Sequence, residues 1–402
     1  MNPGAKGAAQ AIDVARAREE TPGCANVIHF NNAGASLMPR PVLDTVLDHL
    51  RLEAAIGGYE AAEQVDAALE RVYDSVAKLL GAGRDEIAVV ENATRAWDMA
   101  FYSLRFGPGD RILTSAAEYA SNYIAFLHRR RRTGATIEVV PSDATGQISV
   151  EALEGMIDSH VKLISLTWIP TNGGLVNPAK AVGDVARRAR VPFLLDACQA
   201  VGQMPVDVGE IGCDMLSATG RKFLRGPRAV GFLYVRGDFL KTLDPPLLDL
   251  HAATWVLRDV YEVRPDARRF ENFEGNAATK LGLGAAVDYA MAWGIEAIRD
   301  RARSLASVLR ERLAAVPGVT VRDIGAEKCA IVTFTAKGRG AGDIRSALAQ
   351  QRINVTVTAA AATRLDMEAR GLTSMVRASV HYYNTEDEIE RFCEALKEGS
   401  PG

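Results

Sequence analysis

Short apolar runs alternate with helical patterns from about residue 40 to residue 235, and this alternation constrains the fold more than any other feature. Strands that alternate with helices favour a mostly parallel sheet with helices on both faces. The sequence therefore predicts an α/β fold around a seven-stranded sheet. The predicted strands are Glu86–Val90, Arg111–Ser115, Thr136–Val140, Leu163–Thr167, Phe193–Asp196, Met215–Ala218 and Val230–Val235. The predicted helices are Pro41–Ala55, Ala61–Leu80, Trp97–Leu104, Tyr123–Arg132, Val150–Ile157 and Ala179–Ala189.

The chain of 402 residues is long enough for two domains. We predict an N-terminal segment over residues 1–35, whose first 20 or so residues form a mobile arm, a large domain over 36–265, and a smaller C-terminal α/β domain over 266–402. Residues 236–275 have a less regular pattern. The C-terminal elements are expected to be helices Ala277–Trp293, Ile295–Val316 and Glu386–Lys397, and strands Cys329–Phe334, Ile353–Val357 and Val376–Val380.

Composition predicts a cytoplasmic protein that binds neither nucleic acid nor membrane. The net charge is −3, so there is no electrostatic case for nucleic acid. No apolar run approaches the roughly 20 residues that span a bilayer, and the N-terminus lacks the apolar stretch of a signal peptide. The five cysteines show no metal-ligand spacing, which favours reduced thiols and no metal site.

Polar residues stand at or just after the ends of five predicted strands: Asn92, Glu118, Asn172, Asp196 and Thr219. Ligands of parallel sheets gather at the carboxyl ends of the strands. These residues are therefore expected to surround a single active site.

Lys222 and Asp196 together indicate a pyridoxal 5'-phosphate (PLP) site. Lys222 lies between an apolar run and a Gly-Pro turn, where its amine can hold the cofactor as a Schiff base. Asp196 ends an apolar strand, where a carboxylate is costly unless it meets a cation such as the protonated ring nitrogen of the cofactor. The alternative for Lys222 is an ordinary surface lysine.

The phosphate of the cofactor is expected in the strand-to-helix turns at Ala93, Thr94 and Thr219, where backbone N–H groups favour a dianion. Arg221 adds a positive charge nearby. The alternative for Asn92 and Thr94 is simple helix N-capping.

Three further residues are candidates for cofactor or substrate binding. Gln199 is placed to hydrogen-bond the phenolic oxygen of the cofactor, or it simply begins a helix. Asn172, in a Gly-rich turn, is expected to orient the cofactor oxygen or the substrate carboxylate. Arg377 interrupts an apolar strand and needs an anion, which is either the carboxylate of an amino-acid substrate or an internal salt-bridge partner.

Together these residues resemble the class V aminotransferase superfamily, PLP fold type I, which includes the cysteine desulfurases. The resemblance implies the PLP-dependent transferase fold and a homodimer with shared active sites. It also implies that residues near 272–276 reach the partner's phosphate, although Glu274 and Gly275 replace the family's usual Thr. The matching segments are Phe30–Gly34, Glu91–Trp97, Glu118–Asn122, Thr171–Gly174, Asp196–Ala200, Ser217–Gly231, Arg269–Glu271 and Arg377–Asn384.

Three departures from the desulfurase pattern bear on function. The segment Thr358–Arg364, where desulfurases carry a mobile cysteine, has none. Tyr119 replaces the histidine that stacks on the cofactor ring, so either the stacking residue is lost or Tyr119 takes its place. Arg221 replaces the histidine that usually precedes the lysine.

Within the superfamily, Gly57–Glu63 and Gly220–Arg228 look most like the C–S lyases, in particular the hercynylcysteine sulfoxide lyases, with isopenicillin-N-epimerase-like enzymes second. We expect cleavage of a Cβ–S bond with Lys222 as base and Tyr59 or Tyr119 as acid. A packing role for Tyr59 is equally open. The rival activities are transamination or epimerisation on the same scaffold, and PLP binding without catalysis. Candidate substrate-lining residues are His251, Trp255 and Arg258, each of which has a packing alternative.

Overall fold

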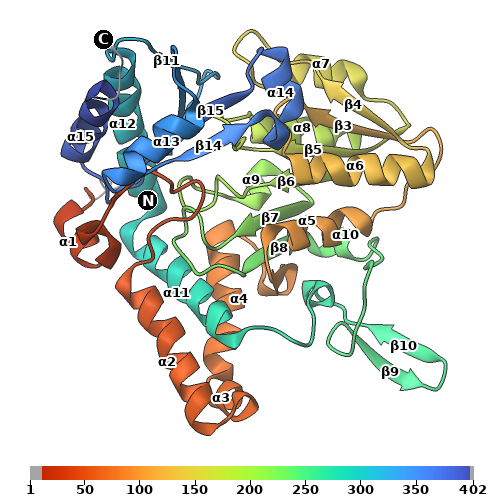
Figure 1. Cartoon of the computed structure of the whole chain (residues 1–402). Helices are drawn as coiled ribbons and strands as arrows, with labels where there is room; N and C mark the ends of the chain where they lie inside the picture. Colours follow the sequence, from red (N-terminus) through yellow and green to blue (C-terminus); the bar gives the residue numbers. More distant parts are fainter. Residues whose placement is uncertain (1–10, 399–402) are drawn as a thin grey trace, which may run out of the picture.

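A computed structural model of the chain describes residues 11–398, and its centre is a seven-stranded sheet (Figure 1). The strand order is β2-β8-β7-β6-β5-β3-β4, and all strands run parallel except β8, which is antiparallel to β2 and β7. The predicted fold class is confirmed. The strands are β2 Ile87–Val90, β3 Arg111–Ser115, β4 Thr136–Val140, β5 Val161–Thr167, β6 Phe193–Asp196, β7 Met215–Thr219 and β8 Gly231–Val235.

Helices cover both faces of this sheet, which explains why its central strands are apolar almost throughout. Successive side chains of β6 point to opposite faces: Leu194 joins one apolar core, while Phe193 and Leu195 join the other. The first core also holds α5 and α6, and the second holds α7, α8 and α4. These helices are α4 Asp66–Leu80, α5 Ala93–Tyr102, α6 Ala120–Thr133, α7 Val150–Met156 and α8 Ala179–Ala189.

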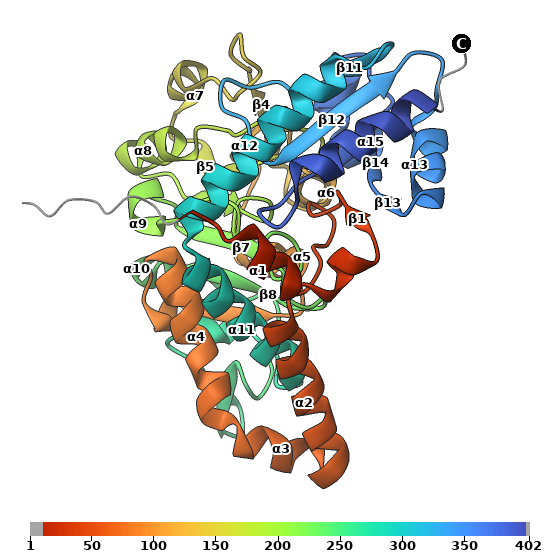
Figure 2. The same cartoon turned by 90° about the vertical axis from the view of Figure 1, so that its left-hand side faces the viewer.

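The predicted single helix Ala61–Leu80 is wrong, because the chain breaks there into two helices. Helix α3 spans Gly58–Gln64 and ends at Val65, whose backbone leaves the helical conformation at φ −110° and ψ 13°. Gly57, at φ 103°, separates α3 from α2 Arg40–Ile56, a conformation that glycine adopts without strain. Figures 1 and 2 show α3 at the far end of an arm formed with α2 and α4.

The C-terminal part is built on a four-stranded antiparallel sheet with order β11-β12-β15-β14. The predicted strand Ile353–Val357 is split, because β13 leaves this sheet to pair with β1 near the N-terminus. The strands are β1 Ile28–His29, β11 Val319–Val321, β12 Ile331–Ala336, β13 Ile353–Asn354, β14 Thr356–Ala359 and β15 Ser374–Ser379. The helices are α11 Ala277–Trp293, α12 Ile295–Ala314, α13 Ala341–Gln350, α14 Arg364–Ala369 and α15 Glu386–Glu398.

The N-terminal segment from residue 11 is tied to the rest of the chain. Helix α1, Val14–Glu19, carries Arg18, whose guanidinium lies 2.8 Å from the Glu388 carboxylate on α15. The expected mobile arm is therefore wrong for residues 11–20, and its first ten residues lie outside the described range. Because β1 pairs with β13, the segment belongs with the C-terminal part. The division near residue 265 into two domains stays a proposal.

An unpredicted β-hairpin occupies the irregular stretch between the two parts. It consists of β9 Ala253–Leu257 and β10 Val260–Val263, follows the short helix α10 Gly237–Leu240, and projects from the body of the molecule (Figure 1). Its apolar side chains are largely exposed, so no burial pattern marked it in the sequence. No helix within residues 11–398 is long and apolar enough to cross a membrane.

Candidate active site

The five polar strand-end residues do gather at one edge of the large sheet. Asp196 and Thr219 are the last residues of the neighbouring strands β6 and β7, and Glu118 and Asn172 follow β3 and β5. Asn92 follows β2 and caps α5 by accepting a hydrogen bond from the Arg95 N–H at 2.9 Å. The N-capping alternative is thus correct for Asn92.

Lys222 lies in the loop after β7 and is partly buried. Burial lowers the pKa of its amine, while the nearby Cys198 and Asp196 raise it and Arg221 and Arg377 lower it further. The structure therefore brings Lys222, Asp196, Arg221 and Arg377 together. A lysine whose pKa is lowered is more often neutral, which is the form that attacks a carbonyl.

The Asp196 carboxylate is buried and held from two sides. Its Oδ1 accepts the Cys198 N–H at 2.9 Å, and its Oδ2 accepts the Asn122 amide at 3.1 Å. No cation among residues 11–398 forms an ion pair with it. A buried carboxylate in this state fits a cationic ligand group.

The start of α5 offers free donors for an anion. The N–H groups of Ala93 and Thr94 have no acceptor among residues 11–398. Gly231 of β8 packs directly on this turn, since a Cβ there would lie 2.9 Å from the Ala93 nitrogen and 2.6 Å from the Ala218 oxygen. Thr219, paired with Gly231, is buried beside the turn. The turn can therefore hold a phosphate.

Gln199 is buried, and its side chain is only half satisfied. Its amide nitrogen donates to the Ala33 carbonyl at 3.1 Å, while its Oε1 has no partner among residues 11–398. Gln199 thus has an unused polar atom close to Asp196 and the Ala33–Gly34 turn.

Arg377 and Asn172 come together from different parts of the chain. Arg377 in β15 donates from Nη1 to the Thr171 carbonyl at 3.0 Å and to its hydroxyl at 2.5 Å, and its buried Nε has no partner among residues 11–398. Asn172 donates to Asp366 of α14 at 2.6 Å. Burial first, and then the charge of Arg221, lowers the pKa of Arg377 to about 10. The alternative for Arg377, an internal salt bridge, is absent among the described residues.

Arg221 and Tyr119 complete the group. The Arg221 guanidinium donates to the Gly34 carbonyl, and burial lowers its pKa. Tyr119, half-buried at the start of α6, lies near enough to Arg221 and Arg377 to influence the pKa of both guanidiniums.

Sequence reasoning missed the side chains that support Asp196. Asn122 donates to Glu118 at 2.9 Å as well as to Asp196, and Glu118 also accepts from Thr114 at 2.7 Å. Glu118 and Asn122 are four residues apart at the beginning of α6, a spacing that lets two side chains meet. That spacing was visible in the sequence, but nothing in it linked the pair to Asp196.

Tyr59, His251, Trp255 and Arg258 do not reach this site in the same chain. Tyr59 lies on α3 with 77% of its surface exposed, and Trp255, on the projecting hairpin, is equally exposed (Figure 1). The Trp255 indole donates to the Arg258 carbonyl at the hairpin end. Gly57 and the hairpin carry Tyr59 and Trp255 outward, and the substrate-site roles of the four residues stay predictions.

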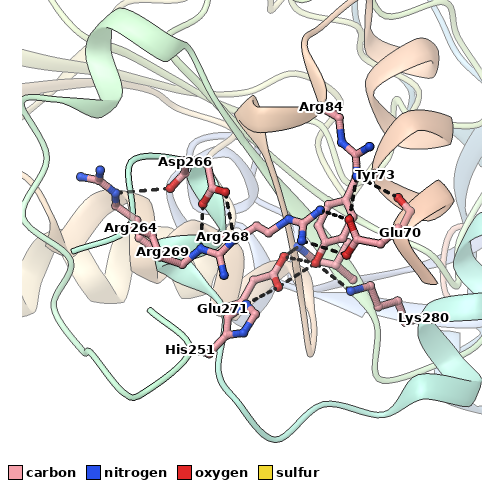
Figure 3. Close-up of polar contacts among 11 residues, drawn as sticks. Glu70, Tyr73, Arg84, His251, Arg264, Asp266, Arg268, Arg269, Glu271 and Lys280 are labelled. Carbon is pink, nitrogen blue, oxygen red and sulfur yellow. Dashed lines mark hydrogen bonds and ion pairs between the residues drawn. The ribbon is translucent and has the colours of Figure 1, made fainter. Parts of the chain in front are cut away.

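Glu271 anchors the loop that resembles the family's partner-facing segment. Figure 3 shows its carboxylate between Tyr73 and His251, at 2.8 Å from the Tyr73 hydroxyl and 3.2 Å from the His251 ring. Lys280 donates to the same hydroxyl at 2.7 Å, and the Arg268 guanidinium lies 3.7 Å from the centre of the Tyr73 ring. This cluster fixes both ends of the exposed loop 272–276.

The unsatisfied groups of the site match PLP and an amino acid. A buried carboxylate without a cation, free N–H groups at a helix start and a buried guanidinium without a carboxylate partner could hold the ring nitrogen, the phosphate and a substrate carboxylate. The fold and this site define a PLP-dependent enzyme of the α/β type.

The comparisons agree. The model of the family Aminotransferase class-V matches residues 28–392, and the chain belongs to this family. A probable cysteine desulfurase of Xylella fastidiosa is 30% identical over 92% of this chain and 90% of its own, and one of Methanothermobacter thermautotrophicus is 28% identical over 95% and 96%.

Solved structures share the fold over nearly the whole chain. The apo cysteine desulfurase of Thermococcus onnurineus has a TM-score of 0.91 and 25% identity, and covers 97% of this chain and 99% of its own. The cystine C–S lyase C-DES, in complex with its product cysteine persulfide, has a TM-score of 0.85 and 24% identity, covering 95% of this chain and 100% of its own.

Proposed function

We propose that the protein is a lyase that cleaves the Cβ–S bond of a cysteine-derived amino acid, an S-conjugate or S-oxide, by α,β-elimination. The observation that carries this proposal is the absence of a usable sulfur-accepting cysteine. Segment 358–364 contains none, and the only cysteine close to Lys222 is Cys198. Burial, and then the charge of Asp196, raises the pKa of the Cys198 thiol well above its ordinary value. A thiol in that state is a poor nucleophile.

The curated relatives are named cysteine desulfurases, and that activity is the nearest competitor. Cys213, Cys329 and Cys393 are buried, and Cys24 lies near Arg18 and α15. None of these thiols is placed to take a sulfur atom from a substrate held at Lys222. The fold is shared with both a cysteine desulfurase and a cystine C–S lyase, so the choice between the two activities rests on the cysteines.

In this proposal each unsatisfied group holds one part of the cofactor. Asp196 pairs with the ring nitrogen, Gln199 contacts the phenolic oxygen, and the turn of Ala93, Thr94 and Thr219 holds the phosphate. When bound, PLP supplies an electron sink for the electron pair released at the substrate Cα.

The remaining residues act on the amino acid. Arg377 binds its carboxylate, and Asn172, held by Asp366, orients it. The Lys222 amine, whose pKa is lowered, removes the Cα proton, and Tyr119 protonates the departing sulfur. The Cα–H and Cβ–S bonds break and a Cα=Cβ bond forms, so that hydrolysis yields pyruvate and ammonia.

Arg221 is assigned to the charge balance of the phosphate, as its place next to the lysine suggests. Its side chain is also close enough to Arg377 to lower the pKa of that guanidinium. Two guanidiniums without a carboxylate partner among residues 11–398 favour a doubly anionic complex of cofactor and substrate.

A homodimer is part of the proposal. Leu250, Trp255, Leu257 and Tyr261 expose 73%, 77%, 64% and 60% of their surfaces, and Tyr59 projects on α3. Exposed apolar groups of this size are typical of protein interfaces. In a dimer, Tyr59 and loop 272–276 are proposed to reach the partner's site, with Tyr59 as the second candidate acid. The five unpaired cysteines support placement in the cytoplasm.

The first test is turnover of cysteine S-conjugates and S-oxides by the PLP-loaded enzyme. We expect pyruvate in proportion to the thiol released from S-conjugates and to the sulfenic acid released from S-oxides. We expect no pyruvate from Lys222→Ala, which also loses the absorbance band of lysine-bound cofactor. Release of alanine with persulfide or sulfide would identify a desulfurase and refute the proposal. Tyr119→Phe compared with Tyr59→Phe then separates the two candidate acids.

The alternatives within the family are transamination and epimerisation. Turnover that depends on an added keto acid, or exchange of the Cα proton without pyruvate, would favour one of them. PLP binding without any turnover would leave a non-catalytic protein, which the combination of Lys222, Asp196 and Arg377 argues against.

A further inference from the structure

A second buried carboxylate, Glu118, lies behind Asp196 and has no role in the proposed reaction. It follows β3, on the far side of β5 from Asp196, since the three strands are ordered β3, β5, β6. Only 3% of Glu118 is exposed. A carboxylate at such a depth requires several donors, and their identity shows what it is built to do.

Four neutral donors surround Glu118. Its Oε2 accepts the Thr114 hydroxyl at 2.7 Å, and its Oε1 accepts the Asn122 amide at 2.9 Å, the Tyr119 N–H at 2.8 Å and the Thr167 hydroxyl. No lysine, arginine or histidine among residues 11–398 forms an ion pair with it. Glu118 is therefore organised as an acceptor of hydrogen bonds and keeps its negative charge uncompensated.

Asn122 connects the two carboxylates. The same amide nitrogen donates to Glu118 Oε1 and, at 3.1 Å, to Asp196 Oδ2. Thr167, another donor to Glu118, is the residue of β5 in register with Asp196. The carboxylates thus share one rigid frame made from three neighbouring strands and the start of α6.

The electrostatics agree with this geometry. Burial raises the pKa of Glu118 to about 6, its hydrogen bonds lower it, and the charge of Asp196 raises it. Asp196 is the titratable group that acts on Glu118, and it in turn acts on Lys222 and Cys198. The side chains of β3, β5 and α6 that contact Glu118 are Thr114, Thr167 and Asn122, and all three are neutral. At neutral pH the Glu118 carboxylate is therefore largely charged.

We propose that Glu118 is a positioning residue that acts through Asn122: it fixes the Asp196 carboxylate and adds a second negative charge behind it, so that the cofactor ring nitrogen keeps its proton. The inference rests on the proposed contact between Asp196 and that nitrogen, but it does not depend on which reaction follows. A second negative charge behind Asp196 is expected to favour the protonated form of the ring nitrogen by roughly tenfold, which raises the pKa of that nitrogen by about one unit.

The test is the titration of the ring nitrogen in the PLP-loaded protein, followed by ¹⁵N NMR with ¹⁵N-labelled cofactor. Glu118→Gln removes the charge and keeps the shape, and the hydroxyls of Thr114 and Thr167 can rotate to accept from the new amide. We expect the ring nitrogen to lose its proton about one pH unit lower than in the wild type. The cofactor is expected to bind roughly tenfold more weakly.

Thr114→Val is the matched control, because it removes one donor from Oε2 but leaves the charge and the Asn122 bridge. Between pH 8 and pH 10 the ring nitrogen of cofactor bound to Thr114→Val should titrate as it does in the wild type. If Thr114→Val lowers the midpoint as much as Glu118→Gln, packing alone explains the effect and the inference is wrong.

Asp196→Asn separates this inference from the placement of the cofactor. A shift in Asp196→Asn with none in Glu118→Gln overturns the role of Glu118 alone, whereas no shift in either overturns the cofactor placement as well. If Glu118→Gln does not fold, infrared difference spectra of the wild type decide. Cofactor binding near pH 5.5 must then abolish a protonated carboxyl band, because the coupling between ring and carboxylate is reciprocal; persistence of that band refutes the proposal.

Discussion

Replacing Arg377 by methionine should leave the cofactor-free protein at least as stable as the wild type. The Arg377 guanidinium is buried without a carboxylate partner among the described residues, and burial lowers its pKa well below the ordinary value, to about 10. That shift corresponds to about 3 kcal/mol against the charged form. Loss of the two hydrogen bonds that this charged donor makes to Thr171 costs about 1.5 kcal/mol each. The free energy of unfolding is thus expected to stay equal or to rise by about 0.5 kcal/mol.

Arg310→Met provides the matched control, because this partly buried arginine does have a partner. Its Nε lies 2.7 Å from Asp323, whose side chain is fully buried. Removing one member of such a pair typically costs about 3–5 kcal/mol. Urea unfolding of both cofactor-free variants measures the difference.

If Arg377→Met lowers the free energy of unfolding as much as Arg310→Met does, the reasoning is refuted. Arg377 would then be a structural residue rather than one that binds an anion. The complementary measurement is binding of an amino acid to the PLP-loaded protein. Removal of a buried arginine that holds a carboxylate should weaken amino-acid binding by about 2–5 kcal/mol. Arg310 lies outside the site, so its removal should not weaken this binding.

Three further predictions address the supporting structure. Gly231→Ala should weaken phosphate binding and destabilise the fold, because its Cβ would lie 2.6–2.9 Å from three backbone atoms. Gly155→Ala in α7 has open space and should be neutral in urea unfolding and phosphate titration. Glu271→Gln should cost about 2–4 kcal/mol in urea unfolding, because it breaks the cluster of Figure 3; no loss would show that the cluster is dispensable. In the cofactor-free protein, the raised pKa of Glu118 means that the folded state binds the extra proton, so stability should fall as pH rises from about 4.5 to about 6, by about 2 kcal/mol, and this slope should vanish in Glu118→Gln.

Buried elements could be predicted from the sequence because burial requires apolar residues at a regular spacing. β3, β6 and helices α8 and α11 have the predicted bounds, and their apolar spacing reflects the burial of their side chains. β4, at the edge of the sheet, also has the predicted bounds although most of it is only partly buried. The strand ends then placed Asp196 and Thr219 at one edge. The β9–β10 hairpin was not predicted, because its apolar side chains are exposed in the single chain and burial therefore imposes no alternating pattern on them.

Contacts between distant segments could not be predicted from local patterns. Asn172 meets Asp366, and Arg377 meets Thr171, only because β15 of the smaller sheet is folded against the turn after β5. Likewise, Tyr59 belongs to a motif that resembles C–S lyases, yet α3 carries it away from Lys222. A residue type at the expected place in a motif predicts a role, while the chain that supplies it to the site is decided by tertiary and quaternary structure.

The acidic residues of the site lie at one end and the basic residues at the other. Glu118 and Asp196 form a negative end under the expected ring nitrogen, and Arg221 and Arg377 form a positive end toward the expected anions. Lys222 lies between them, and the opposing charges act on its pKa in opposite directions, so burial decides that the pKa is lowered. The Lys222 amine is therefore neutral more often than the amine of an exposed lysine. The cofactor and substrate, cationic at one end and anionic at the other, can then bind in only one orientation.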